Sequence, residues 1–89
     1  MKLTWIRGGY RSEPSSKLLA KIEGMSEEVG GVHRSAQAAH RWYFWAGSER
    51  LGIPFVNSFG HPGFASEDEA RAHVRGHVEA AIKVCDKEA

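Results

Sequence analysis

Four consecutive aromatic residues, Trp42 to Trp45, constrain what this chain can fold into. Successive side chains of a β-strand point to opposite faces, so Trp42 and Phe44 would lie on one face, and Tyr43 and Trp45 on the other. Both faces of such a strand are apolar. A helix of the same chain can cover one face, but 89 residues form a single small domain (1–89) with little left to cover the second. The sequence therefore predicts that the second face contacts another molecule.

The N-terminal segments also favour strands. Residues 3–12 are rich in Thr, Trp, Ile and Tyr, and Gly8 and Gly9 are placed where a bulge or sharp bend would be tolerated. Residues 17–24 alternate apolar and charged side chains, which favours a half-buried strand. The same segment also has apolar residues at helical spacing after two serines that could cap a helix, so a helix is the alternative.

The segments on either side of the aromatic run differ in character. Residues 25–40 contain adjacent glycines and no sustained period, which predicts a long connection and a candidate contact loop. After the aromatic strand, residues 47–50 are typical of a hairpin turn, and residues 51–59 predict its partner strand. Pro54 cannot donate a ladder hydrogen bond, so this strand should be short, bulged or at a sheet edge.

The C-terminal part of the chain predicts one helix, from Ser66 to about Cys85. Ser66 and Glu69 form a capping box at its start. Apolar residues then recur at spacings of three and four, which gives one stripe that can pack on a sheet. The stripe consists of Ala70, Val74, Val78, Ala81, Ile82 and Cys85. We therefore predict an α+β fold, in which an antiparallel β-sheet of three or four strands has one C-terminal α-helix packed across one face.

Composition excludes several classes of protein. Twelve basic and eleven acidic residues give a net charge of +1, which is too small for tight nonspecific binding of phosphates. No apolar run approaches the roughly 20 residues of a membrane-spanning helix, and the start lacks the apolar core of a signal peptide, so we expect a cytoplasmic protein. Cys85 is the only cysteine, and it lies near a predicted helix C-terminus, where the dipole disfavours a reactive thiolate.

Histidines raise the question of a metal site. His73 and His77 lie one helical turn apart, a spacing by which two imidazoles can share an ion, and His33, His40 and His61 could complete such a site. The helical pair also flanks the apolar stripe, where boundary histidines are ordinary, and no zinc motif or catalytic pair is present. We therefore expect no metal, no cofactor, no small-molecule substrate and no enzyme activity.

Arginines lie on or beside the strands that carry the aromatic residues. A sheet of exposed aromatic and arginine side chains can stack bases and hold phosphates, so nucleic-acid binding is one hypothesis. Exposed aromatic patches on small proteins usually mark an interaction site. We favour a noncatalytic protein-interaction module that forms a homodimer through the aromatic face or a sheet edge. The predicted partner-binding residues are Tyr43, Trp45, Arg41, Arg7, Tyr10 and Arg11.

Several short motifs carry a resemblance. Thr4-Trp5, Tyr10-Arg11-Ser12, Leu51-Gly52 and the helix opening from Phe64 to Ala70, in a helix that contains His77, resemble small uncharacterised proteins of phages and bacterial mobile elements. The resemblance implies an antiparallel sheet with a C-terminal helix, a mobile-element origin and a host protein as partner. The final stretch is also similar to three-stranded DNA-binding domains of the ethylene-response and integrase N-terminal kind, which implies groove reading by the sheet.

Overall fold

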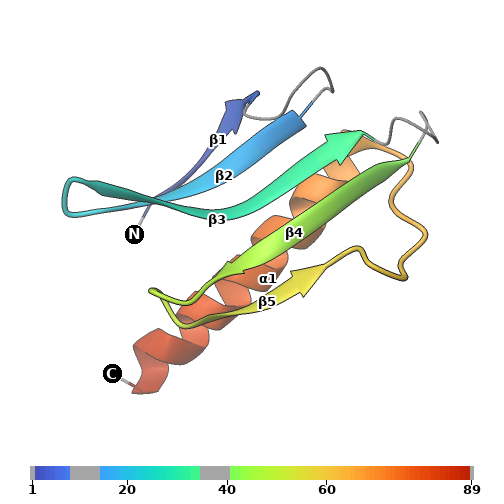
Figure 1. Cartoon of the computed structure of the whole chain (residues 1–89). Helices are drawn as coiled ribbons and strands as arrows, with labels where there is room; N and C mark the ends of the chain where they lie inside the picture. The colour runs from blue at the N-terminus through green and yellow to red at the C-terminus, as the bar shows by residue number, and fades with distance from the viewer. Residues whose placement is uncertain (1, 9–14, 35–40, 89) are drawn as a thin grey trace.

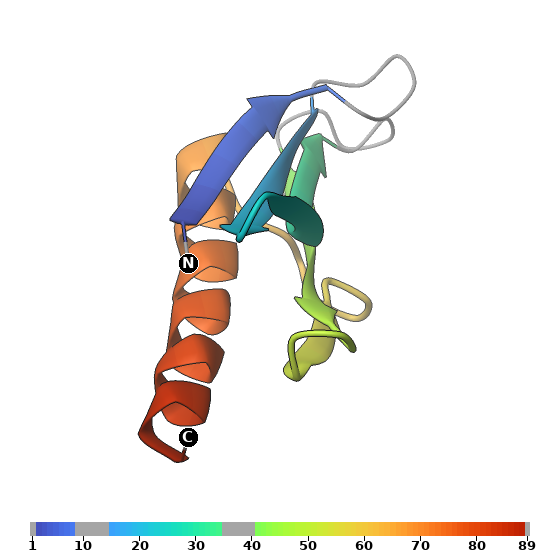
Figure 2. The ribbon, with the colours of Figure 1, turned by 90° about the vertical axis from the view of Figure 1, so that its left-hand side faces the viewer.

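Five strands and one helix form two layers (Figures 1 and 2). The computed structural model describes residues 2–8, 15–34 and 41–88, with side chains up to Ile82. The elements are β1 (Lys2–Arg7), β2 (Ser15–Ile22), β3 (Met25–Arg34), β4 (Trp42–Ser48), β5 (Ile53–Asn57) and α1 (Glu67–Glu88). All pairings are antiparallel, and the spatial order β1-β2-β3-β4-β5 follows the chain. The predicted α+β class is confirmed, with five strands rather than three or four.

The helix covers one face of the sheet. Figure 1 views the molecule from the opposite side, with α1 behind β3 and β4, and Figure 2 shows the two layers edge on. The sheet face opposite α1 is called the open face below. No helix in the described part of the chain is long and apolar enough to cross a bilayer.

The additional strand is β3, in a segment that the sequence predicted as a connection. That prediction was wrong for residues 25–34, which form the central strand of the sheet. Opposite the Leu18 and Leu19 pair of β2, Val29 is an extra residue that shifts the register and hides the alternation of a strand. Residues 35–40 of the predicted connection lie outside the described residues.

Gly30, the first glycine of the pair in β3, serves packing rather than a turn. A Cβ atom on Gly30 would lie within 3.0 Å of Val74 Cγ1, a separation that Cβ atoms essentially never show, and 3.2 Å from the Trp45 carbonyl oxygen. Glycine at this position therefore lets α1 approach the middle of the sheet, because only a residue without a side chain leaves room for Val74.

The other strands follow the sequence more closely. β2 is a strand over Ser15–Ile22, which resolves the alternative of a helix. β1 ends at Arg7, and Gly8 follows it with a φ of +93°, although the remainder of the predicted strand from residue 9 on lies outside the described residues. β5 is five residues long and lies at a sheet edge, as Pro54 requires.

The helix α1 begins where its capping box predicts. The backbone N–H of Glu69 donates to Ser66 Oγ at 3.2 Å, and acidic residues occupy the first turn, at the positive end of the helix dipole. The helix continues to Glu88, beyond the predicted end at Cys85.

The hydrophobic core lies between α1 and the covered face of the sheet. Ala70, Val74 and Val78 of α1 are 0% exposed, and their spacing of four places them on one stripe. Ala81 and Ile82 continue this stripe as partly buried residues. The sheet contributes Leu18, Ala20, Val29, Val32, Phe44, Ala46 and Ile53. The core therefore draws on four of the strands, and the aromatic strand supplies its largest side chain.

Candidate functional site

The aromatic strand β4 divides its side chains between the two faces of the sheet. Phe44 is 4% exposed in the core, and Trp42 packs against the same core. Tyr43 and Trp45 have the opposite parity and lie on the open face, where both are partly exposed. This arrangement follows from the alternation of successive side chains between the two faces of a strand.

The strand β5 and the turn after it add two aromatic residues to the open face. Phe55 is 67% exposed and Phe59 is 95% exposed. The ring of Phe55 packs over Gly47, where an added Cβ would lie 2.7 Å from the ring and where φ is +142°. Sequence reasoning missed both phenylalanines. For Phe55, the sequence signal was a glycine in β4 beside an aromatic residue in β5. In such a pair, the aromatic ring covers the backbone that the glycine leaves exposed.

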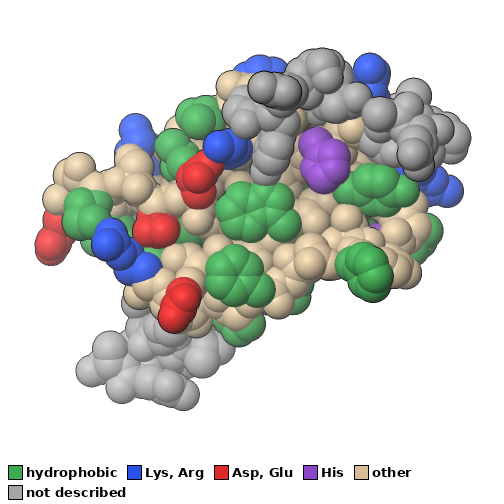
Figure 3. Space-filling view, in the orientation of Figure 1, with side chains coloured by type: hydrophobic (Ala, Val, Ile, Leu, Met, Phe, Trp, Pro, Cys, Tyr) green, Lys and Arg blue, Asp and Glu red, His purple; other side chains and the backbone are tan. Residues whose placement is uncertain are grey.

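The aromatic surface is concentrated on β4, β5 and the turn that follows. In the space-filling view, apolar side chains gather over these elements, and acidic and basic side chains lie beside them toward the β4–β5 turn (Figure 3). Two hollows flank Trp45 on this face. One of them, about 470 Å³, lies between Trp45 and Phe59.

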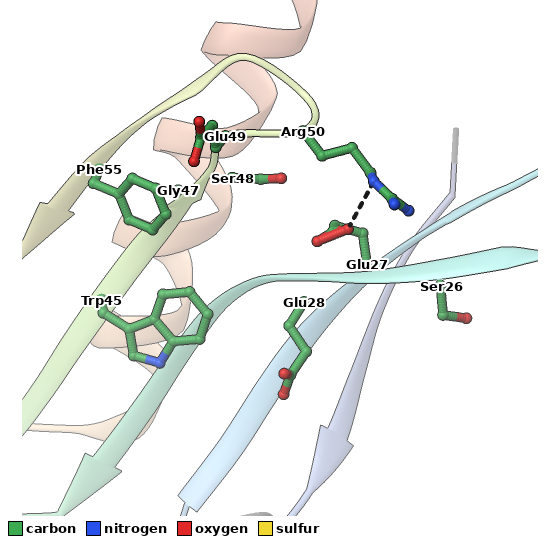
Figure 4. Close-up of a pocket in the computed structure, with 9 residues that line it drawn as sticks. All are labelled: Ser26, Glu27, Glu28, Trp45, Gly47, Ser48, Glu49, Arg50 and Phe55. Atoms are coloured by element: carbon green, nitrogen blue, oxygen red, sulfur yellow. Dashed lines mark ion pairs between the residues drawn. The ribbon is translucent and has the colours of Figure 1, made fainter.

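The larger hollow, about 860 Å³, is called the acidic groove here. Trp45 and Phe55 come from β4 and β5, and Glu27 and Glu28 come from β3 on the opposite side (Figure 4). The full set of lining residues is Ser26, Glu27, Glu28, Trp45, Gly47, Ser48, Glu49, Arg50 and Phe55. Three carboxylates and one guanidinium therefore line the groove beside two aromatic rings.

The charges around the acidic groove are only partly paired. Arg50 Nε lies 3.9 Å from Glu27 Oε1, which is a loose ion pair with the arginine side chain 63% exposed. Glu28 is ion-paired with Lys17 of β2. Glu49 is exposed and forms no salt bridge with the residues that the structure describes. The groove thus carries an excess of negative charge.

The structure describes four of the six predicted partner-binding residues, and it does not place all four on one face. Tyr43 and Trp45 share the open face, and Arg41 directly precedes β4 and is partly exposed. Tyr10 and Arg11 lie outside the described residues. Arg7 lies on the covered side of the sheet, where its guanidinium contacts Glu67 of α1 at 3.1 Å.

A polar cluster joins the ends of β1 and β2 to the first turn of α1. Its centre is Glu67, which accepts hydrogen bonds from Ser16 Oγ at 2.9 Å and from Arg7. Arg71 lies 3.3 Å from the same carboxylate, and its guanidinium stacks 4.9 Å from the centre of the Trp5 ring. This cluster fastens β1 to the helix.

The surroundings of Glu67 change the acidity of its carboxyl group. Partial burial on its own raises the pKa of Glu67, because it disfavours the charged form. The hydrogen bond from Ser16 and the charges of Arg71 and Arg7 favour the carboxylate and outweigh that effect, so the pKa is lowered from the ordinary value of 4.5. The carboxylate is therefore the form that stabilises the fold.

The histidines on the helix side pack with aromatic rings. The centroid of His73 lies 4.8 Å from that of Phe44 and 5.1 Å from that of Phe64. His61 lies 5.5 Å from Phe44, while His77 Nε2 donates to the Pro54 carbonyl at 2.8 Å. Within the described ranges, no three His, Cys, Asp or Glu residues are grouped to hold a metal ion. These imidazoles attach the segment after β5, and β5 itself, to α1.

Comparison of the chain with protein-family models, with curated proteins and with solved structures finds no match. The geometry of the site is therefore the basis for the function proposed below.

Proposed function

We propose that this chain is a noncatalytic protein-interaction module that binds its partner through the open face. The observation that carries the proposal is the exposure of Phe55 and Phe59, at 67% and 95%, beside the partly exposed rings of Tyr43 and Trp45. Clustered exposed aromatic side chains are uncommon on small proteins that act alone, and they are enriched among the residues that dominate protein interfaces.

The open face favours a protein over a nucleic acid as partner. Glu28 and Glu49 lie beside the aromatic rings, where their charges would repel phosphates. Arg7, which the nucleic-acid hypothesis needs on this face, is ion-paired with α1 on the other side. If the nucleic-acid hypothesis is right, single-stranded oligonucleotides will bind at low salt, binding will weaken steeply as salt is added, and Arg41→Ala will reduce it.

The partner is a second copy of the chain or another protein. A copy can associate through the open face or by pairing its β1 edge, because β1 is an outer strand with no proline among its residues. The β5 edge is less suited, since Pro54 has no N–H to donate. A cytoplasmic location, a mobile-element origin and a host protein as partner remain predictions that accompany this proposal.

The test is the solution mass across a concentration series, measured by light scattering after size exclusion. We expect a dimer at low micromolar concentration for the natural chain and a monomer for Phe55→Ser with Phe59→Ser. Both side chains are largely exposed, so the double variant should remain folded. Met25→Ser is the matched control, because Met25 is 55% exposed but lies at the β2–β3 hairpin.

The measured masses distinguish association through the open face from association through a sheet edge. A dimer that persists in the double variant would assign self-association to a sheet edge. If the natural chain is a monomer throughout, self-association is excluded, and the same variants then serve to compare capture of a different protein. Capture that is equal for the natural chain and the double variant would contradict the role of the open face.

A further inference from the structure

We propose that the acidic groove binds an arginine side chain presented by a segment of another protein. This inference rests on the proposed function and concerns the second of its two partners, another protein rather than a second copy of the chain, whose chemistry it names. Its basis is the combination of an aromatic wall, formed by Phe55 and Trp45, with the carboxylates of Glu28 and Glu49 in one hollow of about 860 Å³ (Figure 4).

The aromatic wall offers a surface on which a planar cation can stack. Phe55 is held on the backbone of Gly47 and is 67% exposed, so much of its ring is available to a ligand. The ring of Trp45 extends from β4 toward β3, where Glu28 lies (Figure 4). A guanidinium placed on an aromatic ring gains electrostatic attraction to the π-system and buries its apolar stem.

The carboxylates supply the second half of the recognition. Glu49 has no salt-bridge partner among the described residues, and the pairs formed by Glu27 and Glu28 lie at a partly exposed surface. An incoming guanidinium can donate two parallel hydrogen bonds to one carboxylate, which an ammonium cannot do. The groove therefore suits arginine in particular among cationic side chains.

The protein already holds one of its own arginines between an aromatic ring and a carboxylate. Arg71 stacks 4.9 Å from the centre of the Trp5 ring and lies 3.3 Å from the Glu67 carboxylate. The acidic groove presents the same two kinds of partner, ring and carboxylate, on the open face. The intramolecular contact shows that one aromatic ring of the sheet, together with a carboxylate of α1, holds a guanidinium in this protein.

Charge complementarity decides among occupants. Glu27 and Glu28 are paired with Arg50 and Lys17, so Glu49 supplies the excess negative charge of the groove. That charge would repel a phosphate-bearing ligand, and a purely apolar segment would have to strip water from the Glu49 carboxylate without pairing it. A segment with an exposed arginine satisfies both the rings and the charges. Specific pairing of this kind sets partner choice more than it adds raw affinity.

The test is a titration of the isotope-labelled chain, followed by amide chemical shifts. The probe is a blocked peptide of Arg-Gly-Ser repeats, and the control is the same peptide with citrulline, which keeps the shape of arginine without its charge. We expect the arginine peptide to bind at least about tenfold more tightly at low salt. The shifted amides should include those of Gly47, Glu49 and Phe55, and binding should weaken as salt is added.

Variants connect the binding to the groove. Glu49→Gln and Phe55→Ser should each weaken the arginine peptide about threefold to tenfold. Glu79→Gln is the matched control, because it makes the same change of charge at a partly exposed position of α1, where Glu79 pairs with Arg75. Equal binding of the arginine and citrulline peptides, equal effects of Glu49→Gln and Glu79→Gln, or shifts confined to other surfaces would each overturn the assignment.

The result can be separated from that of the proposed function. If the arginine peptide does not bind but association still depends on Phe55 and Phe59, only the arginine assignment is lost. If the peptide does not bind and association also ignores those two residues, the proposed function is lost with it.

Discussion

Replacing Gly30 with alanine tests how closely α1 lies against the sheet. The added Cβ would lie within 3.0 Å of Val74 Cγ1 and 3.2 Å from the Trp45 carbonyl oxygen, and both neighbours are fixed, one in the core and one in the backbone. Overpacking of this kind costs about 1–3 kcal/mol. Alanine is otherwise preferred to glycine in a strand by about 0.5–1 kcal/mol. We therefore expect the free energy of unfolding to fall by about 0.5–2 kcal/mol.

A double-mutant cycle isolates the contact. Val74→Ala alone should cost about 2 kcal/mol, because it removes buried methyl groups and leaves a cavity. In the double variant, the new methyl group of Gly30→Ala occupies part of the space that Val74 vacates. We expect the double variant to be more stable than the sum of the single effects by at least about 1 kcal/mol.

The assay is urea denaturation followed by tryptophan fluorescence and circular dichroism. Gly76→Ala is the control, since an added Cβ on this helical glycine meets nothing within 4 Å. We expect it to stabilise the protein by up to about 1 kcal/mol. The reasoning fails if Gly30→Ala stabilises the protein as Gly76→Ala does, or if the two substitutions in the cycle are additive.

Three further perturbations have defined outcomes. The folded-state pKa of Glu67 is lowered, so the stability that its carboxylate provides is present above about pH 4.5 and is lost as the pH falls through the lowered value. Glu67→Gln should therefore make the free energy of unfolding fall less steeply in acid. An unchanged fall in acid would contradict the role of this carboxylate. His77→Ala removes the hydrogen bond to Pro54 and should cost about 0.5–1.5 kcal/mol, with faster amide exchange in β5 than in β2. Gly63→Ala forces a side chain onto a φ of +82° and places a Cβ 2.9 Å from Tyr43 Cε1, so it should cost about 1–3 kcal/mol and move the tyrosine ring signals.

Local chemistry made parts of the fold predictable. The capping box at Ser66 and Glu69 acts within one turn, so the start of α1 could be read from neighbouring residues. The alternation around Phe44 is also local, and it predicted that Phe44 lies on the face opposite Tyr43 and Trp45. The missing N–H of Pro54 predicted a strand that is short, bulged or at a sheet edge, and β5 is short and lies at the edge.

The features that sequence reasoning missed depend on distant residues. From the sequence alone, Gly30 is typical of a turn. Its role in packing becomes visible only when the position of α1 is known, because Val74 of the helix occupies the space that a side chain at residue 30 would need. Arg7 was assigned to the contact surface, but its partner Glu67 lies sixty residues away and on the other layer. The exposure of Phe55 likewise depends on which side of the sheet the helix takes, which no strand pattern alone decides.

The strand order has a consequence for how the chain folds. Every strand pairs with its neighbour in the sequence, so each hairpin closes only a short loop and no segment must wait for a distant strand to arrive. The helix is different, since α1 packs on β3, β4 and β5 at once. A hairpin sheet with one face still bare is marginal in water. We therefore expect the hairpins to form and unfold repeatedly until α1 docks. The docking of α1 is then the step after which the chain stays in the native state.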